Sequence, residues 1–392
     1  MPRLTLLLLL LGLIVLEIIG VYFIMPFPGS QQSDSLPFAY WIHTYGMWIR
    51  IALIVLILVL VVSNFKRLHT AWRVVFILLA VFWSVVFYYA NFRFRADKMF
   101  VQPGKKEFAD AANSSVPPER LVVGVSINGE TKAYPIQIIG YHHQVRDTVG
   151  NTPVMVTYCT VCRTGRVFSP FVNGTNEDFR LVGMDHFNAM FEDHTTGSWW
   201  QQATGIAVAG KLKGQSLVEI PSQQSTLSSW LQRYPSTLIL QPDTNFNKRY
   251  DGLKDFDNGT TTDALEKRDS ASWQFKSWVV GVQLADKSRA YDWNMLVEKR
   301  IISDSLGSTP LIVTLENDTA TFHVLSRNTS RGVLSFANDT GGMRDEQTGS
   351  LWTYAGKCEE GELKGEQLKG IQSSQEFWHS WRTFHPQTDS FK

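Results

Sequence analysis

The chain has no excess of charge of either sign. Its 392 residues include 37 Lys and Arg and 36 Asp and Glu, which gives a formal net charge of +1 at pH 7. Because the two signs are interspersed, no basic patch is available to bind nucleic-acid phosphates. The sequence also lacks a dinucleotide-binding fingerprint, a phosphate-binding loop and a nucleophile elbow. These absences argue against nucleic-acid binding and against the enzyme classes that those motifs mark.

Cysteine is scarce, and only Cys159 and Cys162 of the three are close in sequence. Two cysteines separated by two residues can chelate a soft metal ion such as copper or zinc, or close a redox disulfide. A tetrahedral zinc site needs two further ligands, and the chain has no second pair of this kind. The candidate nitrogen ligands are His142, His143, His186 and His194.

The residues around the pair predict a turn between two strands. The strand-like run VMVTY precedes Cys159, and Gly165 with the run RVF follows Cys162. A thioredoxin-type site would instead place the pair at a helix amino terminus. Three interpretations stay open, namely a metal site, a redox-active or nucleophilic thiol, and a structural disulfide that makes the protein a non-catalytic envelope scaffold.

Residues 124–237 and 281–388 repeat each other. Tyr134 aligns with Tyr291 and Asp147 with Asp304, both at an offset of 157 residues. Cys159 and Cys162 align with Glu316 and Thr319, and His142 and His143 align with Lys299 and Arg300. What both copies keep is expected to serve the fold. What only the first copy keeps, the cysteine pair above all, is a candidate for function.

Each copy reads as a β-rich module. Alternating apolar runs flank turn pairs such as Asn128-Gly129, Gly150-Asn151 and Asn173-Gly174, which predict hairpins. Near the end of each copy, LSSWLQRYP and QEFWHSWRTFHP predict short helices that stop at a proline. The fold class is therefore α+β and β-rich, with two tandem modules after an amino-terminal helical part. The predicted parts are residues 1–95 (three transmembrane helices), 96–119 (linker), 120–241 (first module), 242–272 (linker) and 273–392 (second, degenerate module).

Three apolar runs in the first hundred residues are long enough to cross a lipid bilayer. They cover residues 4–25, about 45–62, and 74 to about 90. The basic loop at 66–73 favours the cytoplasm, which places the region after about residue 91 outside it. Glu17 lies in the first run, where an ionisable group is costly. It is either a functional carboxylate or one tolerated at a helix interface.

Two segments of the first module hold the remaining candidate ligands. His142 and His143 end the run YPIQIIGYHH; in an alternating strand one of them would point inward, and His142 is preferred as the ligand. The segment 183–194 holds Asp185, His186 and Asn188, which have no counterpart in the second copy. We expect Cys159, Cys162, His142 and His186 as metal ligands. The expected outer shell around them is Asp185, Asn188 and His143.

The runs YPIQIIGYHHQVRDTVGNTPVMVTYCTVCRTG, GMDHFNAMFEDHTTGSWWQQATG and GKLKGQSL resemble the bacterial family known as domain of unknown function 3179. Its pattern, a His before an Asn-Asp hairpin and then Tyr-Cys-x-x-Cys, falls on His142, Asp147, Tyr158, Cys159, Cys162 and Asp193. This chain has His143 where the family usually has Glu, Arg146 for Asn and Thr160 for Pro. The resemblance implies a bacterial envelope protein, in the inner membrane, and supplies no activity.

The sequence therefore leads to one preferred hypothesis and two alternatives. The preferred one is a membrane-anchored, extracytoplasmic protein whose Cys159 and Cys162 bind copper or zinc. The first alternative is a thiol-disulfide or cysteine-nucleophile enzyme, in which a nearby His lowers the pKa of one thiol. The second is the scaffold with a static disulfide. No protein partner is indicated.

Overall fold

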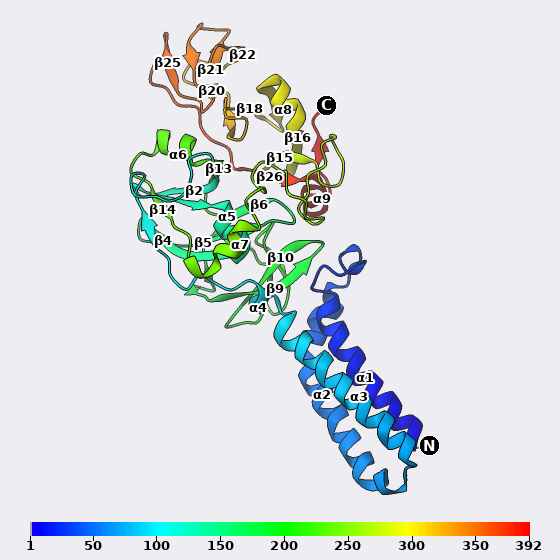
Figure 1. The fold of residues 1–392 in the computed structure, drawn as a ribbon. Helices are drawn as coiled ribbons and strands as arrows, with labels where there is room; N and C mark the ends of the chain where they lie inside the picture. The colour runs from blue at the N-terminus through cyan, green and yellow to red at the C-terminus, as the bar shows by residue number, and fades with distance from the viewer. Residues whose placement is uncertain (1) are drawn as a thin grey trace. The chain divides into compact units, whose positions relative to one another are not determined.

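A computed structural model describes residues 2–392 and divides into two compact units (Figure 1). The first unit comprises the residues up to Val101 together with Glu177–Gln201 and Ile206–Ser216. The second comprises Gln102–Asn176, Gln202–Gly205 and Leu217–Lys392. The α+β, β-rich class predicted from the sequence is confirmed, with long helices first and small sheets afterwards.

Three long apolar helices form the amino-terminal part of the first unit (Figure 1). They are α1 (Pro2–Tyr22), α2 (Leu36–Asn64) and α3 (Thr70–Tyr88), the last extended by a π-helical turn, Tyr89–Arg93. All three are long and apolar enough to cross a membrane, as predicted. Short helical turns at Ser30–Gln32 and Phe65–Arg67 follow α1 and α2, and α4 (Ala96–Met99) follows α3.

A polar cluster joins the three long helices. Arg50 of α2 donates from Nε and Nη2 to the two carboxylate oxygens of Glu17 of α1, at 2.6 and 2.7 Å. Asn91, in the π-helical turn, donates to Glu17 Oε2 at 2.8 Å. Arg50 Nη2 also donates to Asn91 Oδ1 at 3.3 Å. Because Glu17 is paired bidentately and buried, it serves to hold the helices together.

The first unit also contains one four-stranded antiparallel sheet, in the order β12-β11-β10-β9. Its strands are β9 (Phe179–Asp185), β10 (Asn188–Asp193), β11 (Trp199–Gln201) and β12 (Ala207–Ala209). Trp199 lies in a buried cluster with Ala39 of α2, and the Tyr40 hydroxyl donates to the Gly197 carbonyl at 3.0 Å. This sheet therefore packs on the ends of α1 and α2.

The second unit begins with most of the first repeat. A five-stranded sheet has the order β1-β14-β3-β2-β13, and a three-stranded sheet has the order β4-β5-β6. The strands are β1 (Phe108–Ala109), β2 (Leu121–Ile127), β3 (Glu130–Pro135), β4 (Gln144–Val149), β5 (Thr152–Cys159), β6 (Thr164–Phe168), β7 (Phe171–Val172), β8 (Thr175–Asn176), β13 (Gln223–Thr226) and β14 (Leu238–Leu240). The helices are α5 (Ile136–His142), α6 (Leu227–Arg233), a 3-10 turn at Thr244–Phe246 and α7 (Asn247–Asp251). The hairpins predicted at Asn128-Gly129, Gly150-Asn151 and Asn173-Gly174 are all present.

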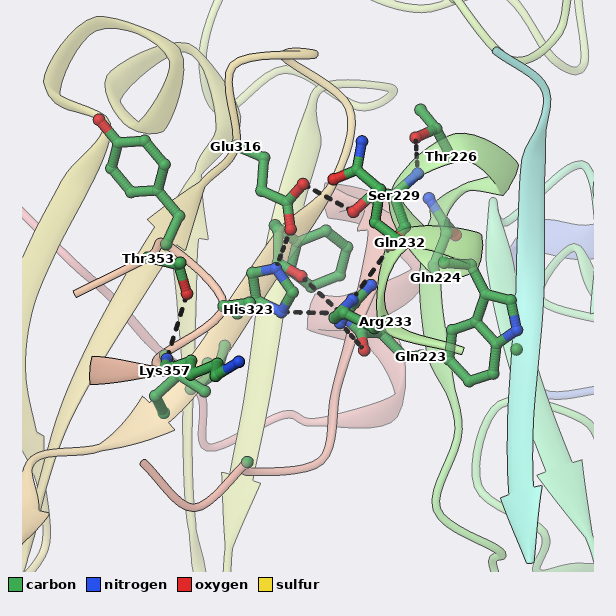
Figure 2. Close-up of a pocket in the computed structure, with 18 of the residues that line it drawn as sticks. Gln223, Gln224, Thr226, Ser229, Gln232, Arg233, Glu316, His323, Thr353 and Lys357 are labelled. Atoms are coloured by element: carbon green, nitrogen blue, oxygen red, sulfur yellow. Dashed lines mark hydrogen bonds and ion pairs between the residues drawn. The ribbon is translucent and has the colours of Figure 1, made fainter. Parts of the chain in front are cut away.

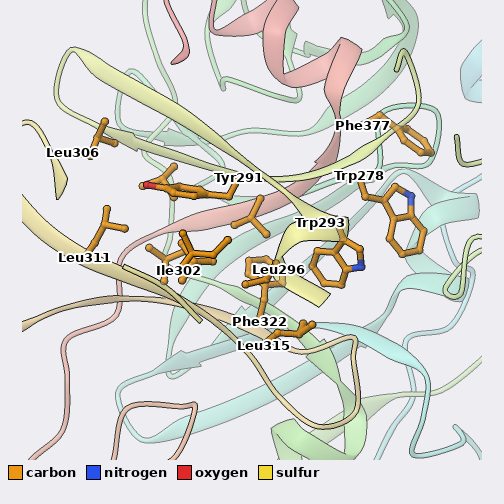
Figure 3. Close-up of a cluster of buried hydrophobic side chains, with 14 residues drawn as sticks. Trp278, Tyr291, Trp293, Leu296, Ile302, Leu306, Leu311, Leu315, Phe322 and Phe377 are labelled. Carbon is orange, nitrogen blue, oxygen red and sulfur yellow. The ribbon is translucent and has the colours of Figure 1, made fainter. Parts of the chain in front are cut away.

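The second repeat has the same order of elements. Its sheets run β26-β15-β16-β27, β17-β18-β19 and β22-β23-β24-β25, with a small β20-β21 hairpin. The strands are β15 (Trp278–Leu284), β16 (Lys287–Asp292), β17 (Ile301–Leu306), β18 (Thr309–Leu315), β19 (Phe322–Ser326), β20 (Asn328–Thr329), β21 (Gly332–Val333), β22 (Phe336–Asp339), β23 (Gly342–Asp345), β24 (Leu351–Trp352), β25 (Cys358–Glu360), β26 (Ser373–Phe377) and β27 (Asp389–Ser390). The helices are α8 (Trp293–Lys299) and α9 (Trp378–Phe384). Figure 3 shows the apolar core that the strands and α8 enclose, with Trp278 and Trp293 edge to face.

The contacts that both copies keep are structural, as expected from the repeat. The Tyr134 hydroxyl donates to Asp147 at 2.8 Å, and the Tyr291 hydroxyl donates to Asp304 at 2.7 Å. The same holds after β10 and β23, where the Trp200 and Trp352 indoles donate to Asp193 and Asp345 at 2.9 and 3.0 Å. The Asp193 carboxylate also caps the turn that follows it, because it accepts from the Thr196 and Ser198 amides.

One sequence expectation about local structure is wrong. The run YPIQIIGYHH is not an alternating strand up to its end, because it turns into α5 after Pro135 and α5 ends at His142. His143 caps the helix in the left-handed conformation, with φ of 62°. Both histidines are buried, so neither points outward. A short helix that follows a strand can bury the same apolar residues as a longer strand. The alternation of apolar and polar residues therefore could not distinguish the helix from the strand.

Candidate functional site

The cysteine pair lies in a tight turn between β5 and β6, as the sequence predicts. Cys159 pairs with Thr164 in the antiparallel register of these strands. Both cysteines are completely buried and are not joined by a disulfide. Their thiols are 3.8 Å apart and in hydrogen-bonding contact. The turn therefore presents two adjacent sulfur atoms inside the protein.

Arg163 holds the turn in shape. Its backbone is left-handed, with φ of 56°, a conformation that is costly for a residue with a β-carbon. The buried guanidinium donates to the side-chain carbonyl of Gln375 at 2.7 Å and to the backbone carbonyls of Phe256 and Asp257 at 3.0 and 2.9 Å. It also lies 3.7 Å from the ring centroid of Trp278. These contacts offset the strain and make the cysteine turn rigid.

The second module covers the turn. The Phe377 amide donates to the Cys162 carbonyl at 2.9 Å, and Lys276 Nζ donates to the Val161 carbonyl at 2.6 Å. His379 Nε2 lies 3.3 Å from the same Val161 carbonyl. The Ser380 hydroxyl, on α9, is hydrogen-bonded to the Cys162 thiol. The degenerate copy therefore supplies one wall of the site that the first copy carries.

Burial dominates the electrostatics of the pair. It raises the pKa of the Cys162 thiol well above its ordinary value, and the neighbouring Cys159 raises it further. The Ser380 hydrogen bond and the Lys276 ammonium act in the opposite direction without reversing the shift. Burial also lowers the pKa of Lys276. At neutral pH Cys162 is therefore a thiol, and it lacks the low pKa of a reactive nucleophile.

The two histidines of α5 have other contacts. His142 Nε2 lies 2.7 Å from the Tyr250 hydroxyl, and its ring lies edge to face with that of Phe246. His143 Nδ1 lies 3.1 Å from the Tyr141 carbonyl, and burial lowers the pKa of His143 to about 4. The backbone carbonyl of His143 accepts from the Tyr158 amide at 3.0 Å, which ties α5 to the strand that carries Cys159.

The remaining candidates lie in the first unit, on the β9-β10 hairpin. His186 Nδ1 is 2.8 Å from Asp185 Oδ1 and its Nε2 is 3.5 Å from Asp34 Oδ1. The Asp185 hydrogen bond raises the pKa of His186. Asn188 is buried and pairs with Asp185 in the strand register. Asp185 is therefore hydrogen-bonded to His186, and a second carboxylate, Asp34, lies on the other side of the same ring.

The four-ligand site is unsupported. Within residues 2–392, no group of three or more His, Cys, Asp and Glu side chains is arranged to hold a metal ion. His142 is oriented toward Tyr250 and His186 toward Asp185. What the structure brings together is the Cys159–Cys162 pair with Lys276, His379 and Ser380, three residues that the sequence reasoning missed. Only the matching positions of Ser229 and Ser380 in the two repeats could have indicated one of them.

The second module has an equivalent of the cysteine turn. Thr157 faces Arg166 in one hairpin and Thr314 faces His323 in the other, so the strand registers of the two copies agree. Glu316 stands where Cys159 stands in the first copy. Its carboxylate accepts from the Ser229 hydroxyl at 2.6 Å. Ser229 of α6 and its equivalent, Ser380 of α9, therefore each contact the turn of the other copy, Ser229 through Glu316 and Ser380 through Cys162.

A cleft of about 1190 Å³ lies at this second position, between the two modules (Figure 2). Its walls come from β13 and α6 of the first module and from the turn 316–318, β19 and the segment 367–373 of the second. Figure 2 shows the Glu316 carboxylate directed toward Ser229 and His323, and the other side of the His323 ring directed toward Gln223 and Arg233. Local sequence patterns could not predict this cleft, because its walls come from segments about a hundred residues apart.

A family model described as "Protein of unknown function (DUF3179)" matches residues 102–388. No curated protein and no solved structure matches the chain. The match covers more than half of the sequence and includes both repeats, so the chain belongs to this family.

Proposed function

We propose that this family member is a membrane-anchored protein whose Cys159–Cys162 pair binds one soft metal ion, with Cu(I) favoured over Zn(II). Three helices that are long and apolar enough to span a bilayer support the anchor. Two thiols held side by side in a rigid, buried turn support the site. Thiolates are soft ligands that favour Cu(I), Zn(II) and iron–sulfur clusters.

The observation that carries the proposal is the 3.8 Å separation of the two thiols. A metal–thiolate bond is about 2.3 Å long, so two sulfurs that share one ion lie at most about 4.6 Å apart. Cys159 and Cys162 meet this limit without movement of the backbone. The locked conformation of Arg163 keeps the spacing in place.

Ligand number and charge favour Cu(I) over Zn(II). A structural zinc site has four protein ligands, and no third His, Cys, Asp or Glu joins the pair within the part of the chain that the structure describes. Two thiolates with one monovalent ion carry a net charge of −1. Lys276, which interacts electrostatically with both cysteines, offsets that charge in the buried site.

A thiol–disulfide pair is the second candidate, favoured by the same contact between the thiols. Oxidation would join the two sulfurs in a bond of about 2.05 Å and pass two electrons and two protons to an external disulfide. Complete burial of both sulfurs and the raised pKa of Cys162 argue against rapid exchange. The static disulfide of the scaffold hypothesis gains no support, since the two sulfurs are not bonded.

The test uses the full chain in detergent, purified without chelator and kept anaerobic. We expect about one Cu(I) per chain in competition with a chromophoric Cu(I) chelator, and loss of that binding in Cys159→Ser and in Cys162→Ser. Cys358→Ser is the matched control, because Cys358 is also buried but lies in β25. Stoichiometric zinc in place of copper, or Cu(I) bound equally by all variants, would contradict the proposal. No metal together with a readily reduced disulfide would support the second candidate.

The charge of the loops supports one orientation of the chain in the membrane. We infer that the 66–73 loop faces the cytoplasm of a bacterial cell and that the modules lie outside the inner membrane, since Lys66, Arg67 and Arg73 cluster in that loop. A reporter that is active only in the cytoplasm, fused after Lys392, should be inactive. The same reporter inserted at residue 69 should be active, and the reverse pattern would exclude this orientation.

A further inference from the structure

We propose that the cleft between the two modules is a binding site for a neutral, hydroxyl-rich ligand of the oligosaccharide class, with Arg233 as its central hydrogen-bond donor. This cleft is separate from the cysteine pair. Four of its features support the proposal: its position beside replaced side chains, the rigid polar wall, the hydrogen-bond donor of Arg233 that has no partner, and the charge of the lining residues.

The two copies fill equivalent positions beside the cleft with side chains of different size. At the first position Arg166 Nη2 donates to Glu376 at 3.0 Å and Arg166 Nη1 donates to Glu219 at 3.2 Å, and Glu376 is fully buried. The residues at the equivalent places of Arg166 and Glu376 are His323 and Ser225. This second pair is smaller than the ion pair of the first position, and of its two residues His323 lines the cleft.

The wall of the cleft is a rigid polar network that crosses between the modules. His323 Nε2 is 2.6 Å from Glu316 Oε1, and Gln223 Nε2 is 2.8 Å from His323 Nδ1. The amide of Gln223 donates, so Nδ1 accepts and Nε2–H donates to Glu316. Burial lowers the pKa of His323 and alone would raise that of Glu316, but the hydrogen bonds from His323 and Ser229 lower the Glu316 pKa overall. A neutral imidazole thus meets an ionised carboxylate whose oxygens are both engaged, which suits binding rather than proton transfer.

Arg233 supplies the donor that this network does not use. Its Nη1 donates to Gln223 Oε1 at 2.7 Å, and its guanidinium lies over the Trp230 ring at 5.8 Å from the centroid. Its Nη2 is buried and has no hydrogen-bond partner among residues 2–392. A buried donor without a partner destabilises the protein, and a ligand acceptor at this point would remove that cost. The ligand must therefore bring an oxygen acceptor to Arg233.

The remaining lining determines the class of ligand. Three carboxylates, Glu316, Asp318 and Glu359, outnumber the two cations, Arg233 and Lys357, so an anionic ligand is not favoured. Amide side chains, which both donate and accept, are frequent among the other lining residues: Gln223, Gln224, Gln232, Asn317, Gln367 and Gln372. Hydroxyl groups also both donate and accept, and they carry no charge. The volume exceeds the usual range for a single small molecule, which favours a chain of several sugar units.

To test the proposal, the full chain is titrated with cellotetraose, maltotetraose and chitotetraose, and binding is detected by saturation-transfer NMR. The detergent must carry no sugar headgroup, since such a headgroup would compete for the cleft. Tetragalacturonate, which has a similar size and four carboxylates, is the anionic comparison. We expect at least one neutral tetrasaccharide to bind, and at least tenfold more tightly than tetragalacturonate.

Two variants locate the binding. Gln232 is exposed on α6 and lines the cleft, so Gln232→Trp should block it and weaken binding at least tenfold without unfolding the protein. Lys299→Trp, equally exposed on α8 but outside the cleft, should bind as the wild type does. Arg233→Lys, which keeps the charge and loses Nη2, should also weaken binding at least tenfold. Binding of none of the neutral probes, equal binding to Gln232→Trp and Lys299→Trp, or tighter binding of tetragalacturonate would each overturn the proposal.

Discussion

The side-chain amide of Gln224 donates to the side-chain carbonyl of Gln375 at 3.0 Å, and these two glutamines occupy the same position in the two repeats. They meet where β13 of one copy lies beside β26 of the other, so the copies are related by an approximate twofold axis at this contact. The edge strand of each copy and the helix that follows it therefore cover the turn of the other copy. The turn of the first copy carries Cys159, and the turn of the second carries Glu316. The duplication thus produced two equivalent turns, one with a buried pair of thiols and the other with a carboxylate beside an open cleft.

Gln375 is expected to contribute more stability than its partner Gln224. Its carbonyl accepts both from Gln224 and from the buried Arg163 Nε. Gln375→Leu leaves a buried guanidinium N–H without a partner, at a cost of about 1–3 kcal/mol, whereas Gln224→Leu removes only the neutral donor. Thermal melting in detergent, followed by tryptophan fluorescence, should give the lower melting temperature for Gln375→Leu. Equal melting temperatures would show that Arg163 finds another acceptor.

Gly124 and Gly281 are expected to tolerate no side chain. A β-carbon would lie 2.4 Å from the Trp230 ring in the first copy and 2.2 Å from the Trp381 ring in the second. Gly124→Ala and Gly281→Ala should each destabilise the protein by about 1–3 kcal/mol through overpacking of a buried indole. Gly370→Ala is the control, since nothing lies within 4 Å of its added β-carbon. Melting temperatures unchanged in the first two variants would mean that the indoles can move aside.

Loss of one partner of the Glu17–Arg50 ion pair is expected to destabilise the protein more than loss of both partners. Glu17→Gln leaves the Arg50 guanidinium without its carboxylate among three apolar helices, and we expect the free energy of unfolding to fall by about 3 kcal/mol. The double variant Glu17→Leu with Arg50→Leu removes both charges and should be closer to wild type. The fraction of protein that stays folded after heating in detergent measures the difference. A double variant less stable than Glu17→Gln would show that the pair contributes net stability.

Acid is expected to destabilise the protein through His143. Burial lowers its pKa to about 4, from an ordinary value of about 6.5 in the unfolded chain. Between these two values the unfolded state binds a proton that the folded state does not, so stability falls as the pH falls, by at most about 1.4 kcal/mol per pH unit. His143→Asn keeps a residue that tolerates the left-handed conformation and should show a smaller loss between pH 6.5 and 4.5. Identical pH dependence of the two melting curves would contradict this assignment.

Much of the architecture could be predicted from local patterns. Apolar runs indicated the three long helices, turn pairs such as Asn128-Gly129 indicated the hairpins, and Pro235 and Pro386 indicated where α6 and α9 stop. The repeat alignment separated the shared Asp147 and Asp304, which hold the fold, from the cysteine pair. These predictions succeeded because they depend on residues that are neighbours along the chain.

The surroundings of the site could not be predicted in the same way. Lys276, His379 and Ser380 reach the cysteine turn from more than a hundred residues away, and Arg233 meets His323 only across the approximate axis. By itself the sequence determined the three long apolar helices, the paired β-rich modules and the turn that carries Cys159 and Cys162. Only the tertiary structure decided that the second copy buries this turn and leaves its own equivalent open. The physical reason is that local propensity acts between neighbours, whereas burial, charge and open volume depend on which distant surfaces pack together.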